Sequence, residues 1–557
     1  MRVSLLLLTL CLASMVSDAG AQISRRDRKR GGQFARYDLS LRVLPDAHRL
    51  EVSGSLRLPS NARRPTEIQL SLSELMGDFK VEVVRPVASA GKATLEKVKV
   101  ENGEATWAVH PPRPFRGGEA VELRFSCAGG GQISSIFYIG PEACFASAYG
   151  TNWYPLVVGG NNRGTGSLRI AVPAGEKAIS EGRRLSSPAE EAEGIFLFEN
   201  NHPTYFSFAS GKYTVVRRGG RIPVSAYLLR TRPNMEQYLE GVPKILDVLA
   251  GEFGPYPYEE FTLVEVPREL ARQASFNAAT VQGLAFINSN AFNLPATEFD
   301  GILEWYGHEF SHMWWPNTVA IRRPGGRYIE EALAEYGGLR VVEALAGPAA
   351  AEQYRRTGYR PDPIYSALEY FKLAGAGFDY QLADLPAGTE AHNIAYNKGF
   401  LVWDMLAREV GRENFRRALR GITARHAFRE LTLNEFWRAI EAGAGGRDLG
   451  WFYEQWFERK GAPEWQLTWK QEGDRVSGAI TQAAPFYRAT LEVGIQGDAG
   501  QYSTHSVKVS GARTEFSLPV RFRAQSVALD PHYLVLRWTP EYRKAAEAAR
   551  SARPSGK

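Results

Sequence analysis

The stretch His308-Glu309-Phe310-Ser311-His312, taken with Glu331 further along the chain, is the most informative part of this sequence. Histidines four positions apart lie on one face of a helix, so both imidazoles can hold one metal ion. Glu309, beside the first histidine, is placed to take a proton from a metal-bound water. Glu331, on a second helical stretch, completes three protein ligands and leaves a fourth position open, as in catalytic zinc sites. The pattern predicts one catalytic Zn²⁺ ion, although other divalent ions suit the same ligands.

Alternatives to this metal site stay open at the level of sequence. The two histidines can be a helix-face pair that hydrogen-bonds to solvent or backbone without holding an ion. Glu330 can compete as the third ligand, although the spacing favours Glu331. Glu335, one helical turn beyond, either orients a ligand imidazole from behind or is a solvated carboxylate.

The start of the chain has the composition of a secretory signal over residues 1–21. Arg2 is followed by a short apolar run, and Ala19-Gly20-Ala21 is a small-residue cleavage site. The run is too short to cross a bilayer comfortably, and no other stretch approaches the length that a membrane-spanning helix needs. We therefore expect an exported protein, periplasmic or extracellular, with no transmembrane segment after signal removal.

Two cysteines, Cys127 and Cys144, remain after the predicted signal. Both lie in the same β-rich region and can form one disulfide in an oxidising compartment. Two buried free thiols are the alternative.

The net charge of +6 is concentrated at the two ends of the chain. Such runs are usually solvated tails, and contact with an anionic surface is the alternative. No interleaved aromatic pattern suggests a nucleic-acid partner. The basic residues concerned are Arg25, Arg26, Arg28, Lys29 and Arg30 at the start and Arg543, Lys544, Arg550, Arg553 and Lys557 at the finish.

A chain of 557 residues is too long for one core, and its patterning predicts a multi-domain α+β protein. Alternating apolar residues and glycine-rich joints over 33–217 predict an N-terminal all-β domain. Helical periodicity with a few strands predicts a mixed catalytic domain over 218–458. Alternation returns over 462–540, which predicts a small β-sandwich, and 541–557 reads as a frayed basic tail.

Individual elements can be placed within these domains. We expect strands at 34–43, 120–125, 167–172, 261–266, 281–287, 465–469, 489–493 and 533–538. We expect helices at 234–253, with a kink or restart at Pro243, at the metal motif as far as about Trp315, and at 328–346. Thr297-Glu298-Phe299-Asp300 resembles a capping box that opens the metal helix.

Several motifs together resemble the gluzincin metallopeptidases typified by membrane alanyl aminopeptidase and leukotriene hydrolase (peptidase family M-one). The stretch from His308 to Trp314 resembles the family's H-E-x-x-H-x-W, and Glu331 to Tyr336 resembles E-G-F-A-E-Y. Tyr396-Asn397-Lys398-Gly399 resembles Y-x-K-G, and Trp153-Tyr154-Pro155 resembles its aromatic-proline corner. The resemblance implies a β-domain, a thermolysin-like zinc domain and a β-sandwich, with peptides or proteins as substrates.

Tyr396 is the expected donor for the oxyanion that forms when water attacks a carbonyl, because a phenolic hydrogen can stabilise that charge. Without the motif resemblance, an ordinary amphipathic tyrosine at a helix start would be favoured. Lys398 and Glu304 are taken as solvent-facing or structural residues.

The chain departs from the family at the G-x-M-E-N motif, whose glutamate binds the substrate's free ammonium. Anchoring the comparison on Gly283 puts Thr280 in the glutamate's place, and the other register puts Phe276 there. No acidic residue occurs between Glu269 and Glu298. Thr280 and Gly283 remain candidate substrate-binding residues, because an edge strand here can bind a peptide backbone by strand addition.

Three hypotheses follow from these observations. The first is an aminopeptidase-like metallopeptidase that uses Glu309 as general base, with exopeptidase and other peptidase specificity both open. The second is a non-peptidase hydrolase, since the family includes a member that opens a lipid epoxide. The third is a catalytically silent zinc-binding scaffold, against which the open ligand position argues.

Overall fold

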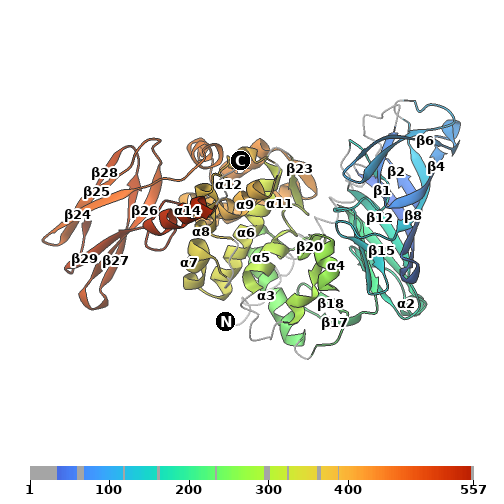
Figure 1. Cartoon of the computed structure of the whole chain (residues 1–557), viewed down its shortest axis with the longest axis horizontal. Helices are drawn as coiled ribbons and strands as arrows, with labels where there is room; N and C mark the ends of the chain where they lie inside the picture. The colour runs from blue at the N-terminus through green and yellow to red at the C-terminus, as the bar shows by residue number, and fades with distance from the viewer. Residues whose placement is uncertain are drawn as a thin grey trace, which may run out of the picture. The chain divides into compact units, whose positions relative to one another are not determined.

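A computed structural model describes residues 34–58, 68–116, 119–159, 163–232, 235–293, 302–322, 325–359, 365–386 and 388–552. The predicted signal, the first basic run, the capping box at Thr297 to Asp300, and Arg553 and Lys557 lie outside the described residues. The chain divides into two compact units. Figure 1 labels the helices and strands of both. One comprises 1–239 and 258–294, and the other comprises 240–257 and 295–557.

The first unit begins with the predicted all-β region, which is confirmed. Its strands form an eight-stranded sheet in the order β14-β15-β12-β1-β2-β8-β4-β5 and two four-stranded sheets, β13-β16-β10-β9 and β11-β3-β7-β6. The elements are β1 Ala35–Leu44, β2 Arg49–Arg57, β3 Ile68–Ser73, β4 Met76–Arg85, β5 Gly91–Lys92, β6 Thr94–Glu101, β7 Glu104–His110, β8 Glu122–Gly130, β9 Phe137–Gly140, β10 Ala143–Ser147, β11 Leu156–Val157, β12 Gly164–Ala171, β13 Lys177–Ser180, β14 Arg183–Arg184, α2 Pro188–Ala192, β15 Ile195–Thr204 and β16 Ser207–Gly211.

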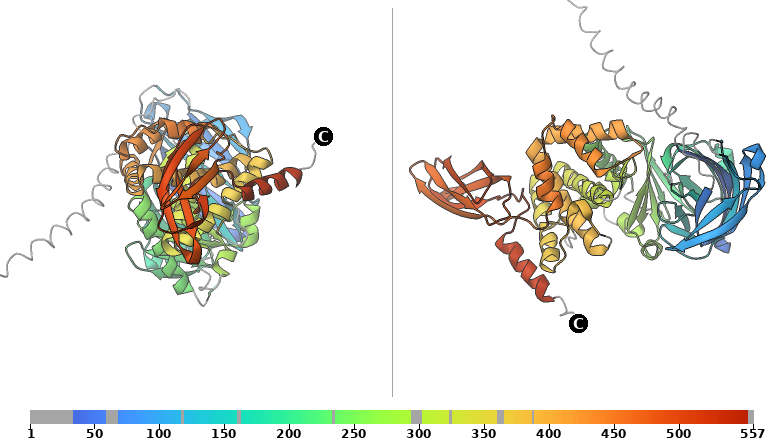
Figure 2. Two further views of the ribbon diagram at one scale, coloured as in Figure 1. Left: turned by 90° about the vertical axis from the view of Figure 1, so that its left-hand side faces the viewer. Right: turned by 90° about the horizontal axis from the view of Figure 1, so that it is seen from above.

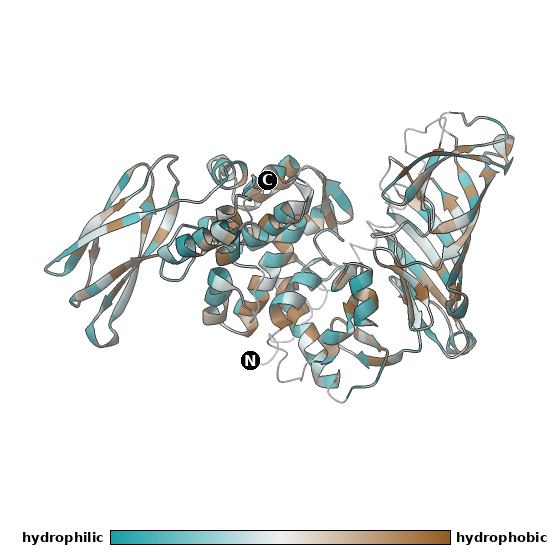
Figure 3. Cartoon of the chain, viewed as in Figure 1, coloured by the Kyte–Doolittle hydropathy of each residue, from teal (hydrophilic) through white to brown (hydrophobic). Residues whose placement is uncertain are grey.

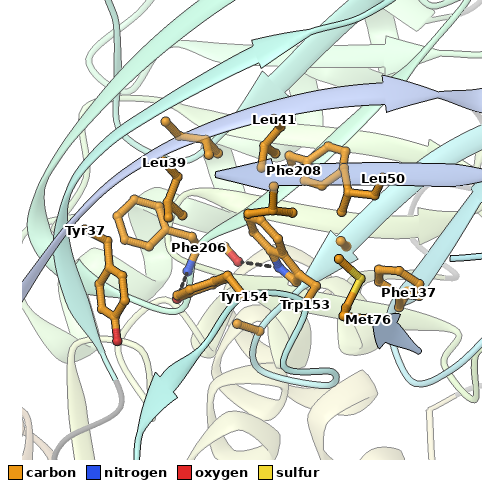
Figure 4. Packing of buried hydrophobic residues seen from close by; sticks show 14 of the residues in the cluster. Tyr37, Leu39, Leu41, Leu50, Met76, Phe137, Trp153, Tyr154, Phe206 and Phe208 are labelled. Atoms are coloured by element: carbon orange, nitrogen blue, oxygen red, sulfur yellow. Dashed lines mark hydrogen bonds between the residues drawn. The ribbon is translucent and has the colours of Figure 1, made fainter. Parts of the chain in front are cut away.

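The core of this β region follows from the alternation of its strands. Along β1 every second side chain is buried, and Figure 3 shows hydrophobic and hydrophilic residues alternating along the strands. The aromatic-proline corner fills the centre of the core (Figure 4). Trp153 packs against Tyr154 with ring centroids 4.7 Å apart, and its Nε1 donates to the Phe206 carbonyl at 3.1 Å. The buried indole is thereby both packed and hydrogen-bonded.

Cys127 on β8 and Cys144 on β10 are buried free thiols. Burial raises the pKa of each thiol to about 12, so both stay protonated at neutral pH. The alternative of two buried thiols is therefore the one the structure shows.

A five-stranded sheet in the order β17-β18-β19-β21-β20 completes the first unit. Its strands are β17 Thr214–Arg218, β18 Val224–Leu228, β19 Phe261–Val266, β20 Ala278–Val281 and β21 Leu284–Asn288, and α4 Arg268–Gln273 lies between β19 and β20 in sequence. The single strand predicted at 281–287 is wrong, because Gly283 adopts φ +77° and turns the chain into a hairpin. The edge strand of this sheet is therefore β20, which carries Thr280.

A buried carboxyl connects this hairpin to the β region. Glu181 is 3% exposed and accepts hydrogen bonds from the Ser207 amide at 2.9 Å and from the Thr204 hydroxyl at 3.2 Å. The same hydroxyl lies 2.7 Å from the Gln282 side-chain oxygen. Burial raises the pKa of Glu181 to about 8, although these hydrogen bonds oppose the shift.

Glu181→Gln is expected to make the first unit's stability less sensitive to alkali. A folded-state pKa above the unfolded value means that the unfolded chain loses this proton first, so wild-type stability falls as pH rises from about 4.5 to 8. The loss is on the order of a few kcal/mol, and glutamine has no proton to lose. Thermal unfolding of both proteins at pH 5 and pH 8 measures it. Equal pH dependence in the two proteins would contradict this account.

The second unit holds most of the described helices, although the residues Met235 to Leu239 that begin the first of them belong to the first unit. The predicted helix at 234–253 is one continuous helix, α3 Met235–Phe253, with Pro243 inside it. The other elements are α5 Leu303–Ser311, β22 Val319–Ile321, α6 Gly326–Leu345, α7 Pro348–Thr357, α8 Ala367–Gly375, α9 Thr389–Asn397, α10 Gly399–Val410, α11 Arg412–His426, β23 Arg429–Leu431, α12 Leu433–Gly443 and α13 Gly450–Tyr453, continued by a π-helical turn at Glu454–Glu458. None of the described helices has the length and apolar character needed to cross a membrane.

The predicted C-terminal sandwich consists of two three-stranded sheets, β24-β25-β28 and β27-β26-β29. Its strands are β24 Gln466–Glu472, β25 Arg475–Thr481, β26 Ala489–Gly497, β27 Tyr502–Val509, β28 Arg513–Pro519 and β29 Ala524–Leu529. The strand predicted at 533–538 is wrong. The Asp530 carboxylate accepts the amides of Leu534 and Val535 at 2.8 and 3.0 Å, which holds this segment in a turn.

The terminal segment is also more ordered than expected. Residues 540–552 form the helix α14 Pro540–Ala552, visible near the C-terminus in Figure 2. Tyr542 stacks on Phe371 of α8 with centroids 4.8 Å apart, and Arg356 donates to Glu541 at 2.9 Å. Packing on α7 and α8 therefore stabilises a segment whose charged composition suggests fraying.

Candidate metal centre

Two closely packed helices, α5 and α6, carry the predicted metal ligands. His308 lies on α5, His312 caps its C-terminal end, and Glu331 lies on α6. A Cβ on Gly307 would lie 2.8 Å from the Gly338 Cα, so the two helices approach as closely as they do because glycine faces glycine. This close crossing brings ligands from separate helices to one point.

The three predicted ligands converge. Their donor atoms all lie within 4.8 Å of one another. The Glu331 Oε2 atom is 3.6 Å from His308 Nε2 and 3.7 Å from His312 Nε2. Zinc bonds of about 2.0–2.2 Å at tetrahedral angles place ligand atoms roughly 3.4 Å apart. The donor set therefore fits a zinc ion, and Glu331 rather than Glu330 supplies the carboxylate in this cluster.

Both imidazoles are oriented through their other ring nitrogen. His308 Nδ1 lies 2.8 Å from Glu335 Oε2, and His312 Nδ1 lies 2.8 Å from the Trp315 carbonyl oxygen. Glu335 is fully buried and also accepts a hydrogen bond from Tyr354. These partners fix the tautomer that leaves each Nε2 atom available to a metal. Glu335 is therefore not a solvated carboxylate, which was one of the two alternatives from the sequence.

The turn after α5 explains one difference from the predicted elements. The metal helix ends at Ser311 and not near Trp315. The chain bends back so that the Trp315 carbonyl reaches the His312 ring, and Pro316 has no amide hydrogen with which to extend the helix. Because α5 ends at Ser311, the Trp315 carbonyl can orient the His312 ring.

The electrostatics of the cluster favour a bound cation. Burial lowers the pKa of His308, but Glu335, Glu309 and Glu331 outweigh it and raise the value to about 9. Burial raises the pKa of Glu331, but His312, His308 and the Tyr396 hydrogen bond hold it below its ordinary value. Carboxylates gathered around two imidazoles can thus neutralise a divalent ion.

The predicted base and oxyanion donor lie at the same place. Glu309 follows His308 on α5 and is half-buried. Tyr396, near the end of α9, is 7% exposed and donates its hydroxyl to Glu331 Oε2 at 2.5 Å. Burial, followed by the charge of Glu331, raises the pKa of Tyr396 well above its ordinary value. The phenol therefore keeps its hydrogen and remains a donor.

Lys398 and Glu304 are both buried, so neither is solvent-facing and both are structural residues. Lys398 donates to the Arg459 carbonyl at 3.3 Å and lies 3.9 Å from the Asp379 carboxylate. Burial lowers the pKa of Lys398 to about 8, and Asp379 opposes that shift. This lysine anchors the start of α10 to the segment that leads into the C-terminal sandwich.

Two aromatic neighbours of Tyr396 were not predicted from the sequence. Tyr365 stacks on the Tyr396 ring with centroids 4.4 Å apart, and His392 contacts it edge-on at 4.6 Å. His392 precedes Tyr396 by one helical turn, a spacing that the sequence displays. Tyr365 is distant in sequence, and no local pattern connects it to the site.

The candidate substrate-binding residues belong to the other compact unit. Thr280 is half-buried on β20, opposite Ala285 of β21, and Gly283 forms the turn between the two strands. The three ligands, Glu309 and Tyr396 all belong to the second unit. A role for Thr280 and Gly283 in binding substrate stays a prediction.

Comparison with known proteins connects this geometry to a family. The model of the "Peptidase family M1 domain" matches residues 238–456 of the chain. That range contains the three ligands, Glu309 and Tyr396. The chain carries a peptidase family M1 domain. The M1 domain thus begins in α3 and ends in the π-helical turn.

Two curated proteins named as aminopeptidases resemble the chain at low identity. The chain is 21% identical over 327 residues to aminopeptidase N of Lactococcus lactis, covering 53% of this chain and 36% of that one. It is 22% identical over 413 residues to leucine aminopeptidase 2 of Pyricularia oryzae, covering 69% and 63% respectively. The chain thus spans between about a third and two thirds of the length of these relatives.

A solved structure shares the fold. Aminopeptidase A of Legionella pneumophila, solved in complex with aspartic acid, superposes with a TM-score of 0.68 at 15% identity. The match covers 92% of this chain and 60% of the other. Likeness at this identity confirms the expected fold class, with a β region followed by a helical region and C-terminal sheets.

Proposed function

We propose that the chain is an exported, zinc-dependent metallopeptidase that hydrolyses peptide bonds. The observation that carries the proposal is the convergence of His308, His312 and Glu331 beside a half-buried carboxylate and a buried phenol. A set of two imidazoles and one carboxylate is a known ligand set of catalytic zinc, which keeps its fourth position open. The aminopeptidase relatives support peptides as the substrate class.

The chemistry assigns one task to each side chain. A zinc ion at this site would polarise a peptide carbonyl and make water more acidic. Glu309 accepts the proton of the attacking water and later passes it to the leaving nitrogen. Tyr396 donates its phenolic hydrogen to the oxygen that gains negative charge. Glu335 holds the His308 ring in place throughout.

Substrate binding is assigned to the edge strand β20 and its turn. In this proposal Thr280 and Gly283 bind an extended peptide by strand addition, which requires backbone contacts and no free amine. The absence of an acidic residue between Glu269 and Glu298 removes the ammonium partner at the expected position. The relatives' names favour free amino termini, so both free and N-blocked peptides belong in the assay.

A peptide-library digest tests the proposed function. Wild-type protein with zinc and the Glu309→Gln variant are incubated with free and N-acetylated peptides, and the products are identified by mass spectrometry. Cleavage by wild type alone supports a metallopeptidase, and its position shows whether the chain end is required. Bound zinc with no cleavage of any peptide would overturn the proposal in favour of a scaffold, or of a hydrolase acting on other bonds.

Export is proposed from the first 21 residues, which have a basic start, an apolar run and a small-residue end. Expression in a bacterial host followed by N-terminal sequencing tests it. A mature chain beginning at Gln22 in the periplasm is expected, and an uncleaved cytoplasmic chain would contradict export.

Tyr396→Phe is expected to lower kcat by about 10²–10³-fold with little change in KM, because the oxyanion loses a donor. Steady-state kinetics and metal analysis measure the effect. Tyr502→Phe is a matched control, since Tyr502 is half-exposed on β27 of the sandwich. A kcat within threefold of wild type for Tyr396→Phe would remove the phenol from the mechanism.

A further inference from the structure

The ring of Tyr396 is stacked on two nearly parallel rings. It lies at an angle of 24° to the His308 ring with centroids 5.3 Å apart. It lies at 11° to the Tyr365 ring with centroids 4.4 Å apart. Offset stacking of this kind contributes about 0.5–1.5 kcal/mol beyond area burial and restricts rotation of the ring. His308 has its own role in the metal site, whereas Tyr365 has none in the mechanism above.

A second contact ties the same two segments together one residue further along. The Ser366 amide donates to the Asn397 side-chain oxygen at 2.8 Å, and both residues are buried. The Asn397 side-chain nitrogen in turn donates to the Asn393 carbonyl at 2.9 Å. Ser366 also caps α8 by accepting the Glu369 amide at 3.2 Å. The backbone that carries Tyr365 is therefore fixed to the end of α9 that carries Tyr396.

Tyr365 is also close enough to the carboxylates of the site to be influenced by their charge. Burial raises its pKa, and the charges of Glu335, Glu331, Glu304 and Glu309 raise it further. Its phenol thus stays neutral beside the reaction centre. The ring is half-buried and close to parallel with Tyr396, so its flat face provides a fixed wall for the catalytic phenol.

We propose that Tyr365 is a positioning residue that holds the Tyr396 ring, through the stack and the Ser366–Asn397 link, at the angle from which its hydroxyl reaches the developing oxyanion. This inference rests on the proposed function of the site for its kinetic consequence. The orientation of Tyr396 itself can be measured without any turnover. A hydroxyl displaced by about 1 Å can cost as much as 10²-fold in rate.

Substitutions at position 365 separate the ring from its hydroxyl. Tyr365→Phe keeps the stack and is expected to retain kcat within threefold. Tyr365→Leu removes the ring and is expected to lower kcat about 10–30-fold with KM changed less than threefold. Tyr365→Met, a flexible side chain without a ring, replaces the leucine variant if that variant melts much earlier. A leucine or methionine variant as active as the phenylalanine variant would overturn the proposal.

A double-mutant cycle distinguishes positioning from a general loss of structure. In a Tyr396→Phe background the hydroxyl that Tyr365 positions is absent, so Tyr365→Leu is expected to lower kcat by less than threefold further. A full 10–30-fold loss in that background would mean that Tyr365 acts independently of Tyr396, and would overturn the inference.

Fluorine NMR of 3-fluorotyrosine incorporated at position 396 tests the orientation directly. A single sharp resonance at the same shift is expected in otherwise wild-type protein and in Tyr365→Phe. A shifted or broadened resonance is expected in Tyr365→Leu. An unchanged resonance in the leucine variant would overturn the positioning role even if the protein is an active peptidase. An inactive wild type with the expected spectra would overturn only the proposed function.

Discussion

Replacing Glu309 with glutamine is expected to lower kcat by about 10³-fold or more while the zinc content stays at one ion per chain. Glutamine has nearly the same shape as glutamate, but its amide cannot accept the proton of the attacking water. Glu309 is outside the ligand cluster of His308, His312 and Glu331, so the metal should remain bound. Steady-state kinetics on a cleaved peptide, with metal analysis of the same sample, measure both quantities.

The neighbouring carboxylate on α6 offers a matched control. Glu330 is half-buried beside the third ligand, but it is not part of the converging cluster. Glu330→Gln is expected to keep kcat within threefold of wild type and to keep its zinc. If Glu309→Gln retained more than a tenth of wild-type kcat, the general base would have to be another group. If Glu330→Gln lost the metal, the choice of Glu331 would be wrong.

Removing one imidazole is expected to lower activity as strongly as Glu309→Gln, because the metal is lost. His312→Ala leaves two protein ligands, so zinc affinity is expected to fall by at least about 10³-fold, and activity is expected to fall to background. Wild-type protein dialysed against a chelator should lose activity in the same way and recover it when zinc is added. Metal analysis after gel filtration, together with peptide cleavage, measures the effect.

A graded variant and a control strengthen this test. Glu335→Gln keeps all three ligands but weakens the group that orients His308, so a 10–100-fold loss of zinc affinity is expected. His426→Ala, at the end of α11, is expected to change neither zinc binding nor activity. Full activity of metal-free wild-type protein would contradict a metal mechanism altogether.

The sequence alone predicts the site residues and the elements whose spacing lies within one helix or one strand. The interval between His308 and His312 is one helical turn, so their convergence follows from the geometry of any α-helix. The interval in sequence between the histidine motif and Glu331 is typical of the family that the chain resembles, so the sequence predicts Glu331 as the third ligand. The structure confirms that its carboxylate joins the cluster. The β region was predicted for the same reason, since alternation along β1 is a property of the strand itself.

Local patterns predict the wrong element where a backbone conformation or a side-chain contact outweighs them. The apolar run at 281–287 reads as one strand, but Gly283 with its positive φ divides it into a hairpin. The alternation at 533–538 also suggests a strand, but the Asp530 carboxylate binds two amides of that segment. Residues 541–552 are charged and rich in alanine, which suggests fraying, but the helix α14 is stabilised where Tyr542 packs on Phe371.

Residue type and motif spacing therefore predict the chemical groups of the site, which are two imidazoles, a carboxylate ligand, a base and a phenol. How those groups are held follows only from the folded chain. Tyr365 and Ser366, which immediately precede α8, reach the site through ring stacking and a hydrogen bond that no local spacing encodes. Secondary structure depends on residues that are neighbours in sequence, whereas the orientation of a side chain in the site depends on contacts across the fold.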